Sequence, residues 1–418
     1  KRVSKEIVQD LKLNKPMLRL VQGDVGAGKT LVAGVAACHA LEADWQVALM
    51  APTEILAEQH YLNFKRWFEP LGIEVAWLSG KQKGKARTQA EQHIKEGHAQ
   101  LIVGTHALFQ DNVGFNKLGL VIIDEQHRFG VDQRLALRNK GNDQFTPHQL
   151  VMTATPIPRT LAMSAYGDLD TSVIDELPPG RTPIQTVTIP LDRREQVLQR
   201  IATNCREGKQ AYWVCTLEEQ SETVDAPAAE VTYQEIKDRF PDVNIGLVHG
   251  KMKANEKQAV MQAFKDNQLQ LLIATTVIEV GVDVPNASIM VIENAERLGL
   301  SQLHQLRGRV GRGATASFCA LLYKAPLSQN GQERLSILRE SNDGFVIAEK
   351  DLEIRGPGEL LGTKQTGDMG FRVVRLERDD HLLSQAHVVA QHILKDYPRQ
   401  ADGLLKRWLP HAPRYAYV

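Results

Sequence analysis

A glycine-rich stretch near the start of the chain constrains the fold more than any other feature. It has the spacing Gly23-x4-Gly28-Lys29-Thr30, with an apolar run before it and a run of good helix formers, residues 31–41, after it. A phosphate-binding loop requires this order of strand, loop and helix. A glycine-rich turn that binds no ligand could have the same sequence, but the apolar segment before it and the helix-forming segment after it favour the phosphate loop.

Each residue type in this loop has a physical role in phosphate binding. Glycines let successive backbone N–H groups curl around an anion, and the helix that follows presents its positive end to it. Lys29 can reach the β- and γ-phosphates of a nucleotide, and the Thr30 hydroxyl can ligate Mg²⁺. We predict nucleotide contacts from the whole loop: Gly23, Asp24, Val25, Gly26, Ala27, Gly28, Lys29 and Thr30.

Length and composition limit the class of protein. A chain of 418 residues is too long for one ordinary core, so two or three domains are expected. Its 50 basic and 50 acidic residues give a formal net charge of zero, so bulk charge offers no argument for a nucleic-acid partner. No apolar run approaches the length of a membrane span. The cysteines lack metal-ligand spacing, and we expect buried thiols in a reducing compartment at Cys38, Cys205, Cys215 and Cys319.

Apolar strands alternate with helical segments in the first part of the chain. This alternation predicts a parallel sheet covered on both faces, with ligands at the carboxyl ends of its strands. Gly23, Thr53, Thr105, Asp124 and Thr153 all fall at such ends. Strands are expected at 18–22, 46–53, 74–78, 101–106, 118–125 and 148–152, and a helix at 54–68.

Two carboxylates, Asp124 and Glu125, end one of these strands. Near a phosphate loop, the first can hold Mg²⁺ and the second can orient or deprotonate an attacking water. The alternative is that the two acids lie in a solvated turn. The presence of the phosphate loop disfavours this alternative. We therefore predict Thr30 and Asp124 as metal ligands and Glu125 as the general base. His127 fits a coupling role and an ordinary hydrogen-bonded histidine equally well.

A Pro/Gly-rich break at residues 176–183 precedes a second alternation of strands and helices. The second alternation contains no further phosphate loop. We therefore interpret the motifs as one nucleotide site that two lobes share. We expect one domain at 1–177, a second at 184–325 and a C-terminal part at 326–418. Strands are expected at 185–189, 210–215, 245–249, 269–274, 288–292 and 317–322, and helices at 192–206, 218–240 and 255–264.

The second alternation carries an arginine-rich motif, Gln305-Leu306-Arg307-Gly308-Arg309-Val310-Gly311-Arg312. Guanidinium groups supplied across a cleft stabilise the charge on a transferring phosphoryl group, so Arg309 and Arg312 are candidate catalytic residues. An arginine-rich surface loop, or a contact to a nucleic-acid backbone, is the alternative.

Together these motifs resemble those of superfamily 2 helicases, and in detail those of the RecG family of branched-DNA helicases. The resemblance implies two RecA-like parallel-sheet α/β domains in tandem, followed by a C-terminal helical hairpin and tail. It implies an ATP- and Mg²⁺-dependent helicase that translocates on double-stranded DNA and remodels forks and Holliday junctions in repair and recombination. The matching stretches are 23–30, 51–54, 104–106, 124–130, 153–160, 274–285 and 305–312.

Several residue roles follow from the resemblance alone. Gln305, Arg309 and Arg312 fall on the ATP-facing motif, with the two arginines as candidate arginine fingers, and Gly281 and Asp283 face the nucleotide ribose. Hydroxyl and basic groups in such motifs hold a phosphate backbone without reading sequence. DNA contact or coupling is implied for Thr53, Thr105, His127, Thr153, Thr155, Lys251, Thr275, Thr276, Arg334, Arg355 and Gln365.

The α/β alternation stops at Pro326. Two helices, 332–340 and 345–354, with a trailing glycine-rich loop, indicate a capping helical hairpin. By resemblance this is the translocation motif that the RecG family shares with the Mfd translocases. Residues 379–408 form an amphipathic helical tail that we expect to pack against the rest of the chain.

The residues alone do not exclude some other functions. An Mfd-like transcription-repair coupling translocase, a nucleotide-gated DNA clamp without turnover, and an RNA substrate are the alternatives. The stretches Gly26-Ala27-Gly28 and Asp124-Glu125-Gln126-His127 favour RecG over Mfd. The partners implied are branched or double-stranded DNA and single-stranded DNA-binding protein, for a monomer in the bacterial cytoplasm associated with the nucleoid. Because the chain begins at Lys1 inside a helical pattern, we expect a fragment without the family's N-terminal wedge domain and adenine-reading glutamine motif.

Overall fold

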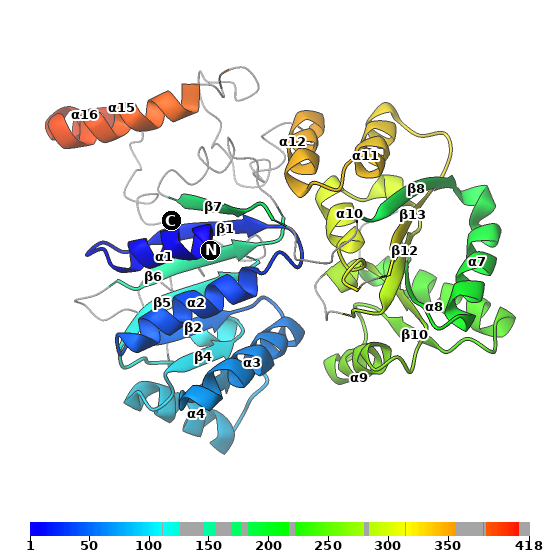
Figure 1. The fold of residues 1–418 in the computed structure, drawn as a ribbon, viewed down its shortest axis with the longest axis horizontal. Coiled ribbons are helices and arrows are strands. Elements are labelled where there is room, and N and C mark those ends of the chain that lie inside the picture. Colours follow the sequence, from blue (N-terminus) through cyan, green and yellow to red (C-terminus); the bar gives the residue numbers. More distant parts are fainter. Residues whose placement is uncertain are drawn as a thin grey trace.

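Two parallel sheets, each flanked by helices, build the chain. The structure is a computed structural model, and Figure 1 shows the two sheets side by side, joined by the chain between β7 and β8. This confirms the predicted fold class. The residues that the structure describes are 1–110, 112–125, 146–155, 169–176, 183–216, 222–279, 284–313, 315–355, 379 and 382–408.

The first lobe is built on a seven-stranded sheet with the order β3-β4-β2-β5-β6-β1-β7, and its strand pairs are parallel. Alternate side chains of β5 enter two different cores, so both faces of the sheet are covered. The strands are β1 (Leu18–Gly23), β2 (Gln46–Met50), β3 (Val75–Leu78), β4 (Leu101–Gly104), β5 (Leu118–Asp124), β6 (His148–Thr153) and β7 (Asp170–Ile174).

The helices of the first lobe follow from their apolar stripes. In α3 the buried positions Ala57, His60, Phe64 and Phe68 recur at helical spacing. One of these four is a histidine, which becomes important in the site. The helices are α1 (Arg2–Leu11), α2 (Lys29–Glu42), α3 (Glu54–Phe68) and α4 (Lys85–Glu96).

The second lobe is built on a six-stranded parallel sheet with the order β10-β11-β9-β12-β13-β8. Tyr212 and Val214 of β9 enter one core, and Ala211 and Trp213 enter the other. The strands are β8 (Gln185–Pro190), β9 (Gln210–Val214), β10 (Ile245–Val248), β11 (Leu271–Ala274), β12 (Ala287–Ile292) and β13 (Phe318–Tyr323); the helices are α7 (Arg194–Arg206), α8 (Glu222–Arg239), α9 (Ala254–Lys265) and α10 (Leu300–Arg307).

The predicted C-terminal hairpin is present as α11 (Gln329–Glu340) and α12 (Gly344–Arg355). Leu335, Leu338 and Ile347 lie in the core of the second lobe, so the hairpin is part of that lobe's packing. The predicted helical tail is present as two helices, α15 (Leu383–Asp396) and α16 (Pro398–Trp408). Its apolar side chains are largely exposed, among them Val388 at 66% and Leu394 at 61%, so the described part of the tail is not packed as expected.

Three elements were absent from the sequence prediction. The edge strand β7 has the sequence DTSVI, which lacks an apolar run, and it pairs with β1. Helix α4 buries only Ile94 and so has no apolar stripe. Helix α10 ends inside the arginine motif, at Arg307, and the sequence analysis assigned no helix there.

Two further observations concern the exposure of the cysteines and the possibility of membrane spans. Cys38 is exposed on α2, contrary to expectation, while the other three cysteines are buried as predicted. Within the described part of the chain, no helix combines the length and apolar character needed to cross a membrane.

Candidate nucleotide site and the cleft between the lobes

The phosphate loop has the backbone geometry that an anion site requires. Gly26 and Gly28 have φ values of 82° and 90°, in the left-handed region that glycine enters without a Cβ clash. Gly28 is the N-cap of α2, and no side chain caps the helix there. The first N–H groups of a helix lack intrahelical partners, so this end of α2 suits a phosphate group.

Lys29 is the basic group of this loop. Its Nζ donates hydrogen bonds to the carbonyl oxygens of Gly23 (2.7 Å) and Asp24 (2.9 Å). Burial lowers the pKa of Lys29, and the nearby carboxylates of Glu125 and Asp124 oppose that shift. The β1 and β5 strand ends thus bring the predicted phosphate ligand beside both predicted acids.

Asp124 is held in place by a residue that the motifs did not reveal. Nε2 of His60 lies 2.7 Å from Asp124 Oδ2, and the backbone N–H of Glu125 donates to Oδ1 at 3.1 Å. Burial opposes ionisation of Asp124, but the His60 hydrogen bond and the Lys29 charge hold its pKa below the ordinary value. A histidine on the apolar stripe of α3 was the available sequence signal.

Glu125 is the predicted general base. Its backbone φ of 53° is unusual for a residue other than glycine and turns the chain sharply after β5. Burial and the charge of Asp124 raise its pKa from 4.5 to about 7. The Ala154 N–H, at the end of β6, donates to Glu125 Oε2 at 3.4 Å. A base that titrates near neutral pH can accept a proton from water efficiently.

The residues present fit a magnesium ion that is shared with a nucleotide. No group of three or more His, Cys, Asp or Glu side chains that could hold a metal occurs among the described residues. Mg²⁺ at nucleotide sites needs only one or two protein ligands, because phosphates and waters supply the others. Thr30, in the first turn of α2, and Asp124 meet that requirement.

The arginine motif faces this site from the second lobe. Burial raises the pKa of Glu125 and the charge of Arg309 partly opposes that rise, while burial lowers the pKa of Lys29 and the charge of Arg312 adds to that fall. Gly308 lies so close to Val25 of the phosphate loop that a Cβ at Gly308 would be 3.1 Å from the Val25 Cβ. The predicted residues of the two lobes therefore meet in one cleft, and Gln305 is buried on α10 beside it.

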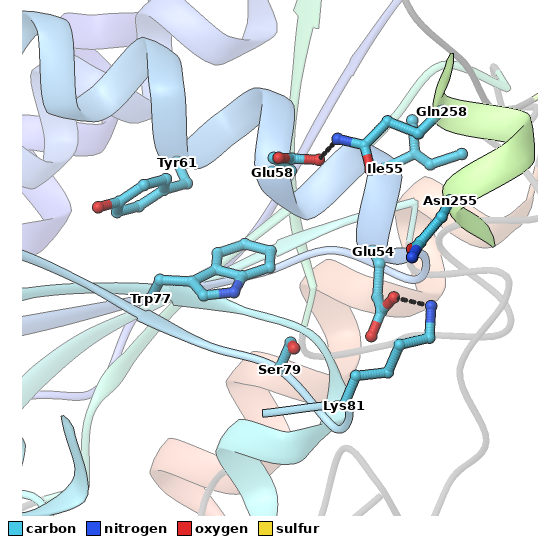
Figure 2. A pocket seen from close by; sticks show the side chains of 9 residues that line it. All are labelled: Glu54, Ile55, Glu58, Tyr61, Trp77, Ser79, Lys81, Asn255 and Gln258. Carbon is cyan, nitrogen blue, oxygen red and sulfur yellow. Dashed lines mark hydrogen bonds and ion pairs between the residues drawn. The ribbon is translucent and has the colours of Figure 1, made fainter. Parts of the chain in front are cut away.

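A second contact between the lobes joins α3 and α9. Gln258 donates to Glu58 at 2.7 Å, and Figure 2 shows both at the edge of a pocket of about 290 Å³. Trp77 and Tyr61 line its wall, and Lys81 pairs with Glu54 at its other side. The hydrogen bond is between polar side chains, as is common where two domains of one chain meet.

The residues implied in DNA contact lie in different environments. Thr53 is the N-cap of α3 and accepts from the Leu56 N–H at 3.4 Å. The Thr153 and Thr155 hydroxyls are 2.8 Å apart. Thr105, Thr153 and Thr275 are buried, Thr155 and Thr276 are partly exposed, and Lys251 is exposed.

Arg334 lies in the middle of α11. Its guanidinium donates to the carbonyl oxygens of Leu298 (3.0 Å) and Glu296 (3.1 Å), which ties α11 to the loop before α10. Arg355 ends α12, and its side chain is not described. His127, Gly281, Asp283 and Gln365 lie outside the described residues.

Comparison with protein families agrees with this geometry. The DEAD/DEAH box helicase model matches residues 2–164, and the helicase conserved C-terminal domain model matches 193–314. The model for the C-terminal part of domain 3 of the ATP-dependent DNA helicase RecG matches 341–404. An ATP-dependent DNA helicase RecG of Escherichia coli O157:H7 is 66% identical over 417 residues, which are 99% of this chain and 60% of the relative. This chain belongs to the RecG family.

Other RecG proteins give the same result. The RecG of Haemophilus influenzae is 62% identical and is likewise covered over 60% of its length, so this chain spans about 60% of the curated relatives it matches. A solved RecG bound to a three-way DNA junction has a TM-score of 0.74 and 44% identity, and the match covers 91% of this chain and 49% of that one. Saccharomyces cerevisiae Dbp5 bound to RNA and ADP BeF3 matches at 16% identity and a TM-score of 0.62, over 86% of this chain and 93% of that one, which shows the fold alone.

Proposed function

We propose that this chain is the core of an ATP-dependent helicase that translocates on double-stranded DNA and remodels branched DNA, through fork regression and Holliday junction branch migration. Its RecG relatives are named ATP-dependent DNA helicases, and a solved RecG is bound to a three-way DNA junction. The match of residues 341–404 to RecG domain 3 favours this family over an Mfd-like translocase. We divide the chain into domains at 1–177, 184–325 and 326–418.

One observation carries the proposal: charges from two lobes converge on one site. Lys29, Asp124 and Glu125 lie together in the first lobe, and Arg309 and Arg312 act electrostatically on Glu125 and Lys29 from the second. A clamp without turnover needs neither a carboxylate beside the phosphate loop to act as a general base nor arginines supplied from the second lobe. The geometry therefore favours hydrolysis.

Each residue has a role in that reaction. Lys29 and the N–H groups of the phosphate loop would hold the β- and γ-phosphates, while Thr30 and Asp124 would hold Mg²⁺, which would neutralise phosphate charge. Glu125 takes a proton from the attacking water. Arg309 and Arg312 offset the charge that develops on the transferred phosphoryl group. Closure and reopening of the cleft then move the two lobes relative to each other along DNA.

The decisive experiment measures the steady-state ATPase rate with no nucleic acid, duplex DNA, single-stranded DNA, a three-way fork and RNA. We expect strong stimulation by duplex and forked DNA and little by RNA. A Lys29→Ala preparation, purified identically, reports contaminating ATPase. Equal rates in all arms would contradict the proposal, and preferential stimulation by RNA would redirect it to an RNA substrate.

Arg334→Ala is expected to uncouple ATP hydrolysis from strand separation. The change removes the two hydrogen bonds that tie α11 to the loop before α10, so the hairpin loses its fixed position on the second lobe. We expect DNA-stimulated ATPase to stay within about threefold of wild type while fork unwinding per ATP falls at least about tenfold, because each lost bond contributes about 1–3 kcal/mol. Arg339→Ala, on the exposed side of the same helix, is the matched control. Normal unwinding by Arg334→Ala would exclude this role.

A further inference from the structure

A part-buried hydrogen bond joins the phosphate loop to the second lobe. His304 Nε2 on α10 lies 2.8 Å from Asp24 Oδ1, and the two side chains are 7% and 17% exposed. Asp24 is the second residue of the phosphate loop, and its carbonyl oxygen accepts from Lys29. The bond therefore connects the loop that holds phosphate directly with the helix that precedes the catalytic arginines.

Arg307 determines which atom of His304 carries the proton. The Nη2 atom of Arg307 lies 3.1 Å from His304 Nδ1. A guanidinium group can only donate hydrogen bonds, so Nδ1 must accept and Nε2 must carry the ring proton. Nε2 therefore donates to the Asp24 carboxylate, a charge-assisted bond that is stronger than one between neutral groups.

Arg307 is in turn fixed to the second lobe. Its side chain is buried, and Nη1 donates to the carbonyl oxygens of Leu338 (2.6 Å) and Ser341 (2.7 Å) in the α11–α12 hairpin. The ring of His304 thus has a buried, hydrogen-bonded guanidinium group on one side and the phosphate loop on the other. A side chain held in this way transmits the position of one lobe to the other.

The catalytic arginines follow within the same short segment. Arg309 and Arg312 come five and eight residues after His304, and Gly308, just before Arg309, packs on Val25. We infer that His304 is a positioning residue that holds this segment in register with the phosphate loop by donating to Asp24. The bond would contribute to closure of the cleft and to placement of both guanidinium groups.

This inference rests on the proposed function, and its test separates the two. Closure of the lobes needs only nucleotide binding and is measured without DNA or turnover. Failure of DNA to stimulate the ATPase would contradict the proposed function and leave the closure result readable. A His304 variant that closes normally would contradict this inference and leave the helicase proposal standing.

Two conservative variants distinguish positioning from local packing. In His304→Gln, the amide nitrogen of the new side chain can occupy the place of Nε2 and still donate to Asp24. The shorter side chain in His304→Asn can replace only Nδ1, so it keeps the Arg307 contact and loses Asp24. We also use His304→Ala and Asp24→Ala, which remove the bond from either side, and the exposed His98→Ala as the matched control.

The measurement is a fluorescence distance between dyes at Glu42→Cys on α2 and Glu207→Cys after α7. Both positions are exposed, and the background is Cys38→Ser because the other three cysteines are buried. Closure is titrated with Mg²⁺ and a non-hydrolysable ATP analogue. We expect the half-closure concentration to rise about tenfold in His304→Ala, Asp24→Ala and His304→Asn, and to stay within about threefold in His304→Gln and His98→Ala.

Turnover and a double variant complete the test. We expect kcat/KM to fall at least about tenfold in His304→Ala, because the loss of closure both weakens apparent nucleotide binding and misplaces catalytic groups. Asp24→Ala combined with His304→Ala should be no worse than either alone. Closure within about twofold of wild type in His304→Ala, equal closure by the Asn and Gln variants, or additive effects in the double variant would each overturn the inference.

Discussion

Glu125→Gln is expected to slow ATP hydrolysis by about 10²–10⁴-fold, because an amide cannot take the proton of the attacking water. Nucleotide affinity should change little, since Lys29 and the phosphate loop remain intact. The measurement is phosphate release at saturating ATP and fork DNA, with equilibrium binding of a fluorescent ATP analogue beside it. Glu54→Gln, a partly exposed carboxylate on α3 that pairs with Lys81, is the matched control.

The same substitution is expected to stabilise the protein at alkaline pH. Burial and Asp124 raise the pKa of Glu125 from 4.5 to about 7, so the folded state holds this proton more tightly than the unfolded state. Below about pH 4.5 both states are protonated and no penalty exists. As pH rises toward 7 the unfolded state loses the proton first, and stability falls by on the order of 3 kcal/mol.

Calorimetry without nucleotide or Mg²⁺ tests this sign. Glu125→Gln removes the ionisable group, so its melting temperature should exceed that of wild type at pH 8 and approach it near pH 4.5. A variant that melts below wild type at pH 8 would contradict the raised pKa. Wild-type turnover by Glu125→Gln would exclude Glu125 as the base.

Arg312→Ala is expected to reduce DNA-stimulated kcat by about 10³-fold or more, the usual contribution of an arginine that stabilises a transferring phosphoryl group. The charge of Arg312 acts on Lys29 from the second lobe. The loss of rate should therefore appear only in the step that needs a closed cleft. The KM for ATP should change less, because the phosphate loop makes most of the ground-state contacts.

Arg312→Lys is the informative companion. It keeps a positive charge but not the planar pair of donors, so we expect it to recover only part of the rate. Arg206→Ala, an exposed arginine that pairs with Asp242, is the control. Full DNA-stimulated ATPase in Arg312→Ala would show that the cross-cleft role is wrong.

Local sequence patterns determined much of this protein. The phosphate loop, the fully apolar β5 strand and the alternation of strands and helices predicted two parallel sheets, because these depend on the period and composition of contiguous residues. The same patterns placed Asp124 and Glu125 at a strand end beside Lys29. Weakly patterned elements such as β7 and α4 were missed because tertiary contacts, and not their own periodicity, stabilise them.

Only the tertiary structure decided the contacts between distant residues. His60 and Asp124 are 64 residues apart, and Asp24 and His304 are 280 apart, so nothing local marks either pair. Burial of the Thr105 and Thr275 side chains could likewise not be predicted from the sequence, because the sequence pattern of a threonine at a strand end does not show whether its hydroxyl faces solvent or the core. The sequence by itself determined which chemical groups each lobe carries. The packing of the two lobes decided which of those groups meet. A hydrogen bond requires a donor–acceptor distance that is correct to within a few tenths of an ångström, and only the assembled cleft provides it.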